Sequence, residues 1–177
     1  MELRTDRLLL RRWRPTDREA FARLNADPVV MQHFVGTLSQ EDSDAFADRI
    51  EKHFEEHAFG LWAVEVPGVA PFVGFVGLSV PTFEAHFMPA VEVGWRLDRP
   101  YWGRGYATEA ARASVADGFE RVGLREIVSF TTPINVASIA VMERLGMTRD
   151  PNDDFDHPRV PKGHPIRRHV LYRIAAP

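Results

Sequence analysis

The segment from Gly103 to Ala107 has residue types and spacing that suit phosphate binding. Gly103 and Gly105 let backbone N–H groups come close together, and the Ala-rich sequence that follows is typical of a helix start. The free N–H groups of a first helical turn attract anions, because the positive end of the helix dipole lies behind them. The segment therefore predicts an anion site that requires no charged side chain.

Two common nucleotide loops are excluded at this position. The pattern GxxxxGK[ST] occurs nowhere in the chain, and the segment from Gly103 to Thr108 lacks the third glycine of GxGxxG. Short glycine motifs beside helices also occur in proteins that bind no phosphate. The ligand therefore has to be inferred from the surrounding sequence.

Three motifs in this chain resemble those of the GNAT superfamily, the acyl-CoA-dependent N-acyltransferases. Residues 102–107, WGRGYA, resemble its Q/R-x-x-G-x-G/A pyrophosphate loop, with Trp102 where Gln or Arg is usual. Residues 3–11, LRTDRLLLR, resemble the first strand of the branch that includes the ribosomal-protein N-terminal acetyltransferases of RimJ/RimL type. Residues 135–138, NVAS, followed by ERLGM resemble the second cofactor-side helix of that branch. The resemblance spans nearly the whole chain.

This resemblance implies an α/β fold in a single domain over residues 1–177, with a strongly twisted mixed sheet flanked by helices. It also implies acetyl-CoA as co-substrate and no metal. Two central parallel strands, 91–97 and 126–132, would splay to admit the pantetheine arm, and an N–H near Val93 or Gly94 would face the acyl oxygen. The residues implied to hold the cofactor are Trp95, Leu97, Trp102, Gly103, Arg104, Gly105, Tyr106, Ala107 and Asn135.

Glu92 is the candidate base. It lies on the strand beside the expected acyl carbonyl, between apolar residues that would raise its pKa. Period-2 alternation alone also explains it as an ordinary outward-facing carboxylate. A protein α-amine is already about one-tenth neutral at pH 7, so a weak or water-mediated base suffices for it. Glu84 and His86 in the preceding loop are reserve candidates.

The acid that protonates the departing thiolate is less clearly marked. Many GNAT members use a tyrosine, and alignment on Asn135 places Met142 at that position. Ser138, one helical turn earlier, is the substitute that the branch resemblance implies. Asn135 has two compatible explanations, a contact to pantetheine and a helix cap.

His53 and His57 form an H-x-x-E-H match with Glu56, a pattern found in zinc proteases. Residues four apart share one helix face, but no third ligand is indicated. His157 and His164 lie in a proline-rich segment, where loop packing or solvent exposure explains them. A zinc hydrolase is thus one alternative function, and a CoA-binding sensor without turnover, suggested by Met142, is another.

Hydrophobic periodicity and breakers predict the elements that would position these residues. Residues 150–169, with four prolines, predict a stiffened loop, and Asp153, Asp154 and Asp156 would attract a cationic amine if it closed over the acceptor site. A helical pair, from Pro15 to Leu24 and from Ser39 to Ala58, would form one wall of that site. The other predicted elements are strands at 3–13, 60–66, 72–80, 90–97, 125–132 and 169–174, and helices at 108–122 and 135–145.

Composition narrows the function further. The absence of cysteine removes a Cys acyl-enzyme, so transfer should be direct from donor to acceptor. The net charge of -3 argues against nonspecific nucleic-acid binding and favours a cationic acceptor. The charged N-terminus predicts a strand and not a secretion signal, and no apolar run is long enough for a membrane span, so a cytoplasmic location is expected.

The sequence thus predicts an N-acetyltransferase that uses acetyl-CoA and a primary amine. The acceptor stays open among a protein N-terminus, a polyamine, an aminoglycoside and a small metabolite amine. The branch resemblance slightly favours the peptide α-amine. A homodimer is compatible with the sequence.

Overall fold

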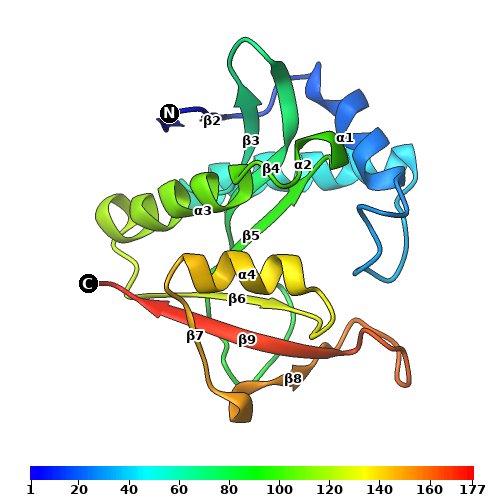
Figure 1. Ribbon diagram of the computed structural model, residues 1–177, viewed down its shortest axis with the longest axis vertical. Coiled ribbons are helices and arrows are strands. Elements are labelled where there is room, and N and C mark those ends of the chain that lie inside the picture. Colours follow the sequence, from blue (N-terminus) through cyan, green and yellow to red (C-terminus); the bar gives the residue numbers. More distant parts are fainter.

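The computed structural model describes residues 1–177 and contains one nine-stranded mixed sheet with helices packed on it (Figure 1). The strands are β1 (Glu2–Arg4), β2 (Leu9–Arg11), β3 (Leu61–Val66), β4 (Ala70–Ser79), β5 (Glu92–Leu97), β6 (Glu126–Thr131), β7 (Thr148–Arg149), β8 (Phe155–Asp156) and β9 (Arg168–Ala175). The helices are α1 (Asp17–Ala26), α2 (Gln40–His57), α3 (Tyr106–Asp117) and α4 (Val136–Arg144). None of them combines the length and apolar character needed to cross a bilayer.

The sheet divides between β5 and β6. Its order is β1-β2-β3-β4-β5-β6-β9-β7, with β8 also paired to β9. All neighbours are antiparallel except β5 and β6, which are parallel and pair only at Glu92 and Val128. Beyond that point the two strands separate, and Figure 1 shows β5 joining an upper set of strands to a lower set that contains β6 and β9. The predicted splay of two central parallel strands is confirmed.

Helices cover both faces of the sheet, as predicted. Phe21 of α1 and Phe46 of α2 pack against Phe75 of β4, with ring centroids 5.9 and 5.8 Å apart respectively. Leu78 has the opposite parity on β4, and its side chain lies under Gly118 at the end of α3. Residues from both layers belong to the main buried core.

Three predicted segments differ in the structure. The predicted strand from Leu3 to Trp13 is two strands, β1 and β2, because Thr5 forms a turn: its N–H donates to the Leu8 carbonyl and its Oγ1 accepts from the Leu8 N–H. The predicted helix 108–122 begins at Tyr106 and continues from Gly118 as a π-helical turn that ends at Gly123. The segment 150–169 contains the short strand β8 and a 3₁₀ turn, whereas its prolines had predicted only a loop.

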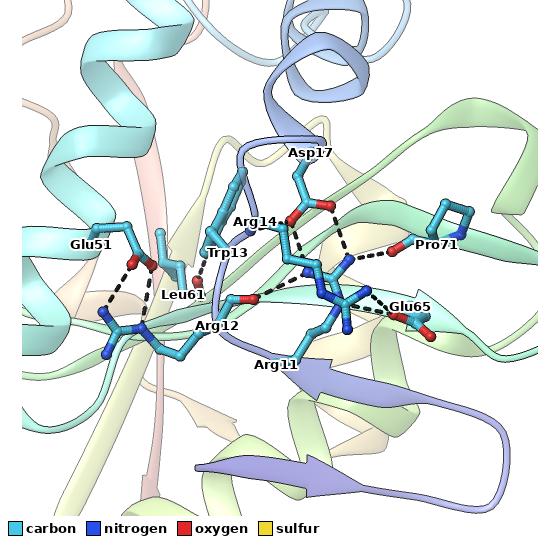
Figure 2. Close-up of polar contacts among 9 residues, drawn as sticks. All are labelled: Arg11, Arg12, Trp13, Arg14, Asp17, Glu51, Leu61, Glu65 and Pro71. Atoms are coloured by element: carbon cyan, nitrogen blue, oxygen red, sulfur yellow. Dashed lines mark hydrogen bonds and ion pairs between the residues drawn. The ribbon is translucent and has the colours of Figure 1, made fainter.

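A buried ion pair joins the end of β2 to the start of α1 (Figure 2). Arg11, only 4% exposed, donates to both carboxylate oxygens of Asp17 at 2.8 and 2.9 Å. The same guanidinium also donates to Glu65 of β3 and to the Pro71 carbonyl, so most of its N–H groups are hydrogen-bonded. The contact fixes the position of α1, which packs against α2, a helix that lines the cavity described below.

Replacing Asp17 with asparagine should destabilise the protein by about 2 to 3 kcal/mol, because one charge of a buried pair loses its closest counter-ion. The matched control is Glu51→Gln, which removes the half-exposed ion pair with Arg12 in the same region and should cost no more than about 0.5 kcal/mol. Urea unfolding of both variants measures the difference. Equal losses would contradict the role of the buried pair.

Candidate active site

A large cavity lies where the sheet splits. It has a volume of about 780 Å³ and is lined by the α1–α2 loop, α2, β4, β5, β6, α4 and the loop before β9. This size is in the range of small-molecule sites. One wall is formed by α2 and the loop before it, whereas α1, predicted to share this wall, contributes no lining residue; the proline-rich loop contributes another wall through His157, Arg159 and His169.

Alternation along β5 puts three residues on the cavity face. Glu92, Gly94 and Arg96 all line the cavity, whereas Val93 and Leu97 are buried in the core. The Glu92 carboxylate has no hydrogen bond or ion pair, and burial raises its pKa to about 8. A Cβ built at Gly94 would meet only Glu92 Oε1, at 3.7 Å. Open space therefore lies directly beside a carboxyl group whose pKa suits proton transfer near neutrality.

The backbone of β5 presents unpaired groups to the gap. The Val93 carbonyl accepts from Ser129 Oγ of β6, whereas the Asp98 N–H donates to Val73 of β4. Because successive residues point to opposite sides, Trp95 directs its N–H and C=O toward the gap and Gly94 directs its own toward β4. The structure thus disfavours Gly94 as the oxyanion donor. The Leu97 carbonyl is occupied by the Trp102 indole N–H, at 2.7 Å.

The glycine segment forms a loop at the start of α3. Gly103 and Gly105 both have left-handed backbone conformations, with φ of 72° and 80°. Gly105 is the N-cap residue of α3. It has no side chain to accept a hydrogen bond, so no capping side chain occupies the first N–H groups of the helix. Arg7 holds the loop in place by donating to the Arg104 carbonyl and to Glu109 of α3. The Arg104 guanidinium has no carboxylate partner, which leaves the loop electropositive.

Ser138 and Asn135 meet Trp95 at the gap. Ser138 Oγ accepts from Trp95 Nε1 at 3.2 Å and from Asn135 Nδ2 at 3.1 Å, so its own O–H remains available as a donor. Asn135 Oδ1 accepts from the Ser138 N–H, which confirms the predicted helix cap. Its amide donates to Thr131 and Ser138, so only Oδ1 could accept a further contact. Met142 is 1% exposed beside them and carries no transferable proton.

The zinc-site interpretation of His53 is wrong. His53 Nδ1 bonds to the Phe59 carbonyl at 3.0 Å, and Nε2 accepts from the Val80 N–H at 3.1 Å, so neither ring nitrogen is free for a metal. Glu56 faces Lys52 at 3.5 Å. The histidine serves instead to tie α2 to the end of β4, and burial lowers its pKa.

Several loop residues lie outside the cavity. Glu84 and His86 are exposed and do not line it. The predicted acidic attraction is also absent, because Asp153 pairs with Arg173 and Asp154 with Arg149, away from the cavity. Asp156 likewise pairs with Arg167, just before β9, and with Arg168, the first residue of β9.

His157 and His164 are loop-packing residues, as expected. His157 Nδ1 accepts from the Arg159 N–H, and His164 Nδ1 from that of Ile166. The His157 ring packs 4.5 Å from Phe83, and burial lowers its pKa to about 4. It is therefore neutral at physiological pH and contributes an aromatic surface to the cavity wall.

A family model described as acetyltransferase (GNAT) domain matches residues 7–148, most of the chain. The chain belongs to the GNAT acetyltransferase family. It is an enzyme of the N-acetyltransferase class, which removes the alternative of a sensor domain without turnover. The matched range includes the loop at Gly103, the splayed strands and α4.

Individual acetyltransferases are similar over most of this chain. FsC-acetyl coenzyme A-N(2)-transacetylase of Aspergillus fumigatus is 35% identical over 74% of this chain and 58% of its own length. A GNAT-family acetyltransferase structure from Bacillus anthracis superposes with a TM-score of 0.80, 27% identity and coverage of 99% and 98% of the two chains. RimL, a ribosomal L7/L12 alpha-N-protein acetyltransferase in complex with coenzyme A, shares the fold at a TM-score of 0.79, 18% identity and coverage of 99% and 98%.

Sequence reasoning missed three site residues. Arg96 lies on the same face of β5 as Glu92 because the two are an even number of residues apart. This spacing could have predicted Arg96 as a site residue. Asn25 of α1 and His33 after it come from distant sequence, and no local pattern connects them to β5. They reach the same region only because α1 and α2 pack over that face of the sheet.

Proposed function

We propose that this GNAT protein transfers the acetyl group of acetyl-CoA to a primary amine by direct attack in a ternary complex, within one domain formed by residues 1–177. The observation that carries the proposal is the unpaired Glu92 carboxyl, which lines a cavity at the point where β5 and β6 separate. A base, an open gap for a donor and space for an acceptor coincide there. The Aspergillus relative is named as an acetyl coenzyme A-N(2)-transacetylase, which supports the same donor and a nitrogen acceptor.

The donor site follows from the free backbone groups. The N–H groups of residues 103–107 would bind the pyrophosphate, assisted by the positive end of α3. The C=O of Trp95 would accept a hydrogen bond from a pantetheine amide in the gap. Leu97 would take part through its N–H, since Trp102 occupies its carbonyl. Asn135 would have Oδ1 available as an acceptor.

The reaction needs one proton acceptor and one donor. The amine nitrogen attacks the thioester carbon, the C–N bond forms and the C–S bond breaks, and the amine proton passes to Glu92. The Trp95 N–H, the free N–H nearest Glu92 on the gap side, stabilises the negative charge on the acyl oxygen. Ser138 passes its hydroxyl proton to the departing thiolate and takes one back from solvent, while Trp95 and Asn135 hold its oxygen.

The kinetic order tests direct attack. Initial rates of CoA-thiol release, measured while both acetyl-CoA and the amine are varied, should give lines that intersect in a double-reciprocal plot. Parallel lines would indicate an acetyl-enzyme intermediate and overturn the ternary complex.

A further inference from the structure

Arg96 is a charged side chain in the cavity wall without a counter-ion. Its guanidinium lies 4.2 Å from the Phe34 ring centroid and 5.4 and 5.8 Å from those of Phe75 and Phe46. Its single hydrogen-bond acceptor in the protein is Asn25 Oδ1, 2.5 Å from Nη1. Aromatic rings and one neutral amide therefore surround a full positive charge.

The remaining donors of Arg96 are unused. A guanidinium carries five N–H groups, and leaving such a charge desolvated and unpaired is unfavourable. Nε is buried with no hydrogen-bond partner, and so is Nδ1 of His33, another residue that lines the cavity. Nη2 also has no acceptor. It is not fully buried, so it is open to the cavity. Burial lowers the pKa of Arg96 to about 10, which still leaves it charged at neutral pH.

No other group in the cavity neutralises this charge. Glu56 faces Lys52, and the Glu92 carboxyl is mainly protonated at pH 7. Arg49 is a second cation without a carboxylate partner, and its guanidinium lies 5.5 Å from the centroid of Phe46, a ring that Arg96 also approaches. The Arg96 end of the cavity is therefore electropositive and lacks an anion.

We propose that the acceptor amine also carries a carboxylate, as a free amino acid does, and that Arg96 binds this carboxylate. The inference rests on the function proposed above. A planar carboxylate of single charge matches the paired N–H groups and the charge of one guanidinium. Glu92 and Arg96 share one face with only Gly94 between them, so amine and carboxylate would lie over the glycine. This replaces the expectation of a cationic acceptor.

The test compares matched acceptors that differ in the carboxylate, with kcat/KM expressed per neutral amine because the amide lowers the pKa of the α-amine. The twenty free amino acids and their primary amides are each offered with acetyl-CoA, and kcat/KM is measured by thiol release. The wild-type protein should prefer the acid over the amide by about 10- to 100-fold for its best amino acid, the range expected for a hydrogen-bonded charge pair.

The Arg96→Gln variant should lower this ratio to about 1 through loss of activity on the acid. Arg96→Lys should restore part of the preference, because it restores the charge without the paired N–H groups. Arg23→Gln, which removes an exposed arginine paired with Glu19 on α1, is the matched control and should leave the ratio unchanged. The ratio is taken within one preparation, so a reduced folded fraction cancels.

Equal rates on acid and amide, an unchanged ratio in Arg96→Gln, or acetylation of peptides or polyamines but of no amino acid would overturn the carboxylate site and leave the proposed function standing. A preparation that binds acetyl-CoA but acetylates no amino acid would also overturn it. Absence of acetyl-CoA binding in calorimetry would instead overturn the proposed function.

Discussion

Replacement of Glu92 by glutamine should lower kcat by about 100- to 10,000-fold, the usual contribution of a positioned general base. In the wild-type protein kcat/KM should rise with pH and level off above about 8, because only the ionised carboxyl accepts a proton. The variant should lose this dependence. Stopped-flow or steady-state thiol release from pH 6 to 9 measures both effects.

Two acceptors with different amine pKa values distinguish the enzyme from its substrate. If the midpoint of the rise in kcat/KM stays near pH 8 for both acceptors, the titrating group belongs to the protein. If the midpoint moves with the acceptor, the titrating group is the amine. Glu126→Gln, an exposed carboxylate on the adjacent strand paired with Arg173, is the matched control. A Glu92→Gln variant with nearly wild-type kcat would exclude this carboxyl as the base.

Stability supplies an independent control for the same variant. The native state holds the Glu92 proton up to about pH 8, whereas the ordinary carboxyl pKa is 4.5. Ionisation between these values therefore disfavours the native state, and the associated stability is present below pH 4.5 and lost as the pH rises to 8. Glu92→Gln should accordingly melt at or above the wild-type temperature at pH 8, so lost activity would not reflect unfolding.

Gly103→Asp should weaken acetyl-CoA binding by about 100-fold or more, because it places a carboxylate near the expected pyrophosphate. The position accommodates the side chain: no atom lies within 4 Å of a Cβ there, and Asp and Asn tolerate its positive φ better than other residues. Gly103→Asn is nearly isosteric and neutral, so it controls for shape and backbone strain.

Calorimetric titration with acetyl-CoA compares the two variants. Asn should bind within several-fold of wild type, and the deficit of Asp should shrink at high salt. Equal affinities for Asp and Asn would show that the loop at Gly103 does not hold the phosphates.

The sequence was most informative where one local pattern determines the structure. Alternation from Val91 to Leu97 predicted the strand and which of its residues share a face with Glu92, but not that this face lines a cavity. Asn135 was recognisable as a cap because its side chain bonds to a backbone group three residues later. The left-handed turns at Gly103 and Gly105 likewise follow from residue type.

Long-range electrostatics was beyond the sequence. The aspartates at 153, 154 and 156 read as a site for a cation, but arginines brought beside them by folding compensate their charge. Arg96 reads as an ordinary strand residue, and only the packing of α1 and α2 shows that no carboxylate reaches it. Which charges are paired is a property of the tertiary structure. This pairing leaves the cavity electropositive at Arg96.

The most direct test of acetyl transfer at this site is to quantify CoA thiol and N-acetylated amine in the same reaction. We expect equal amounts of the two products, formed only when both acetyl-CoA and the amine are present, with both lost together in Glu92→Gln. Thiol released without acetylated amine would indicate hydrolysis, and it would contradict direct acetyl transfer at this site.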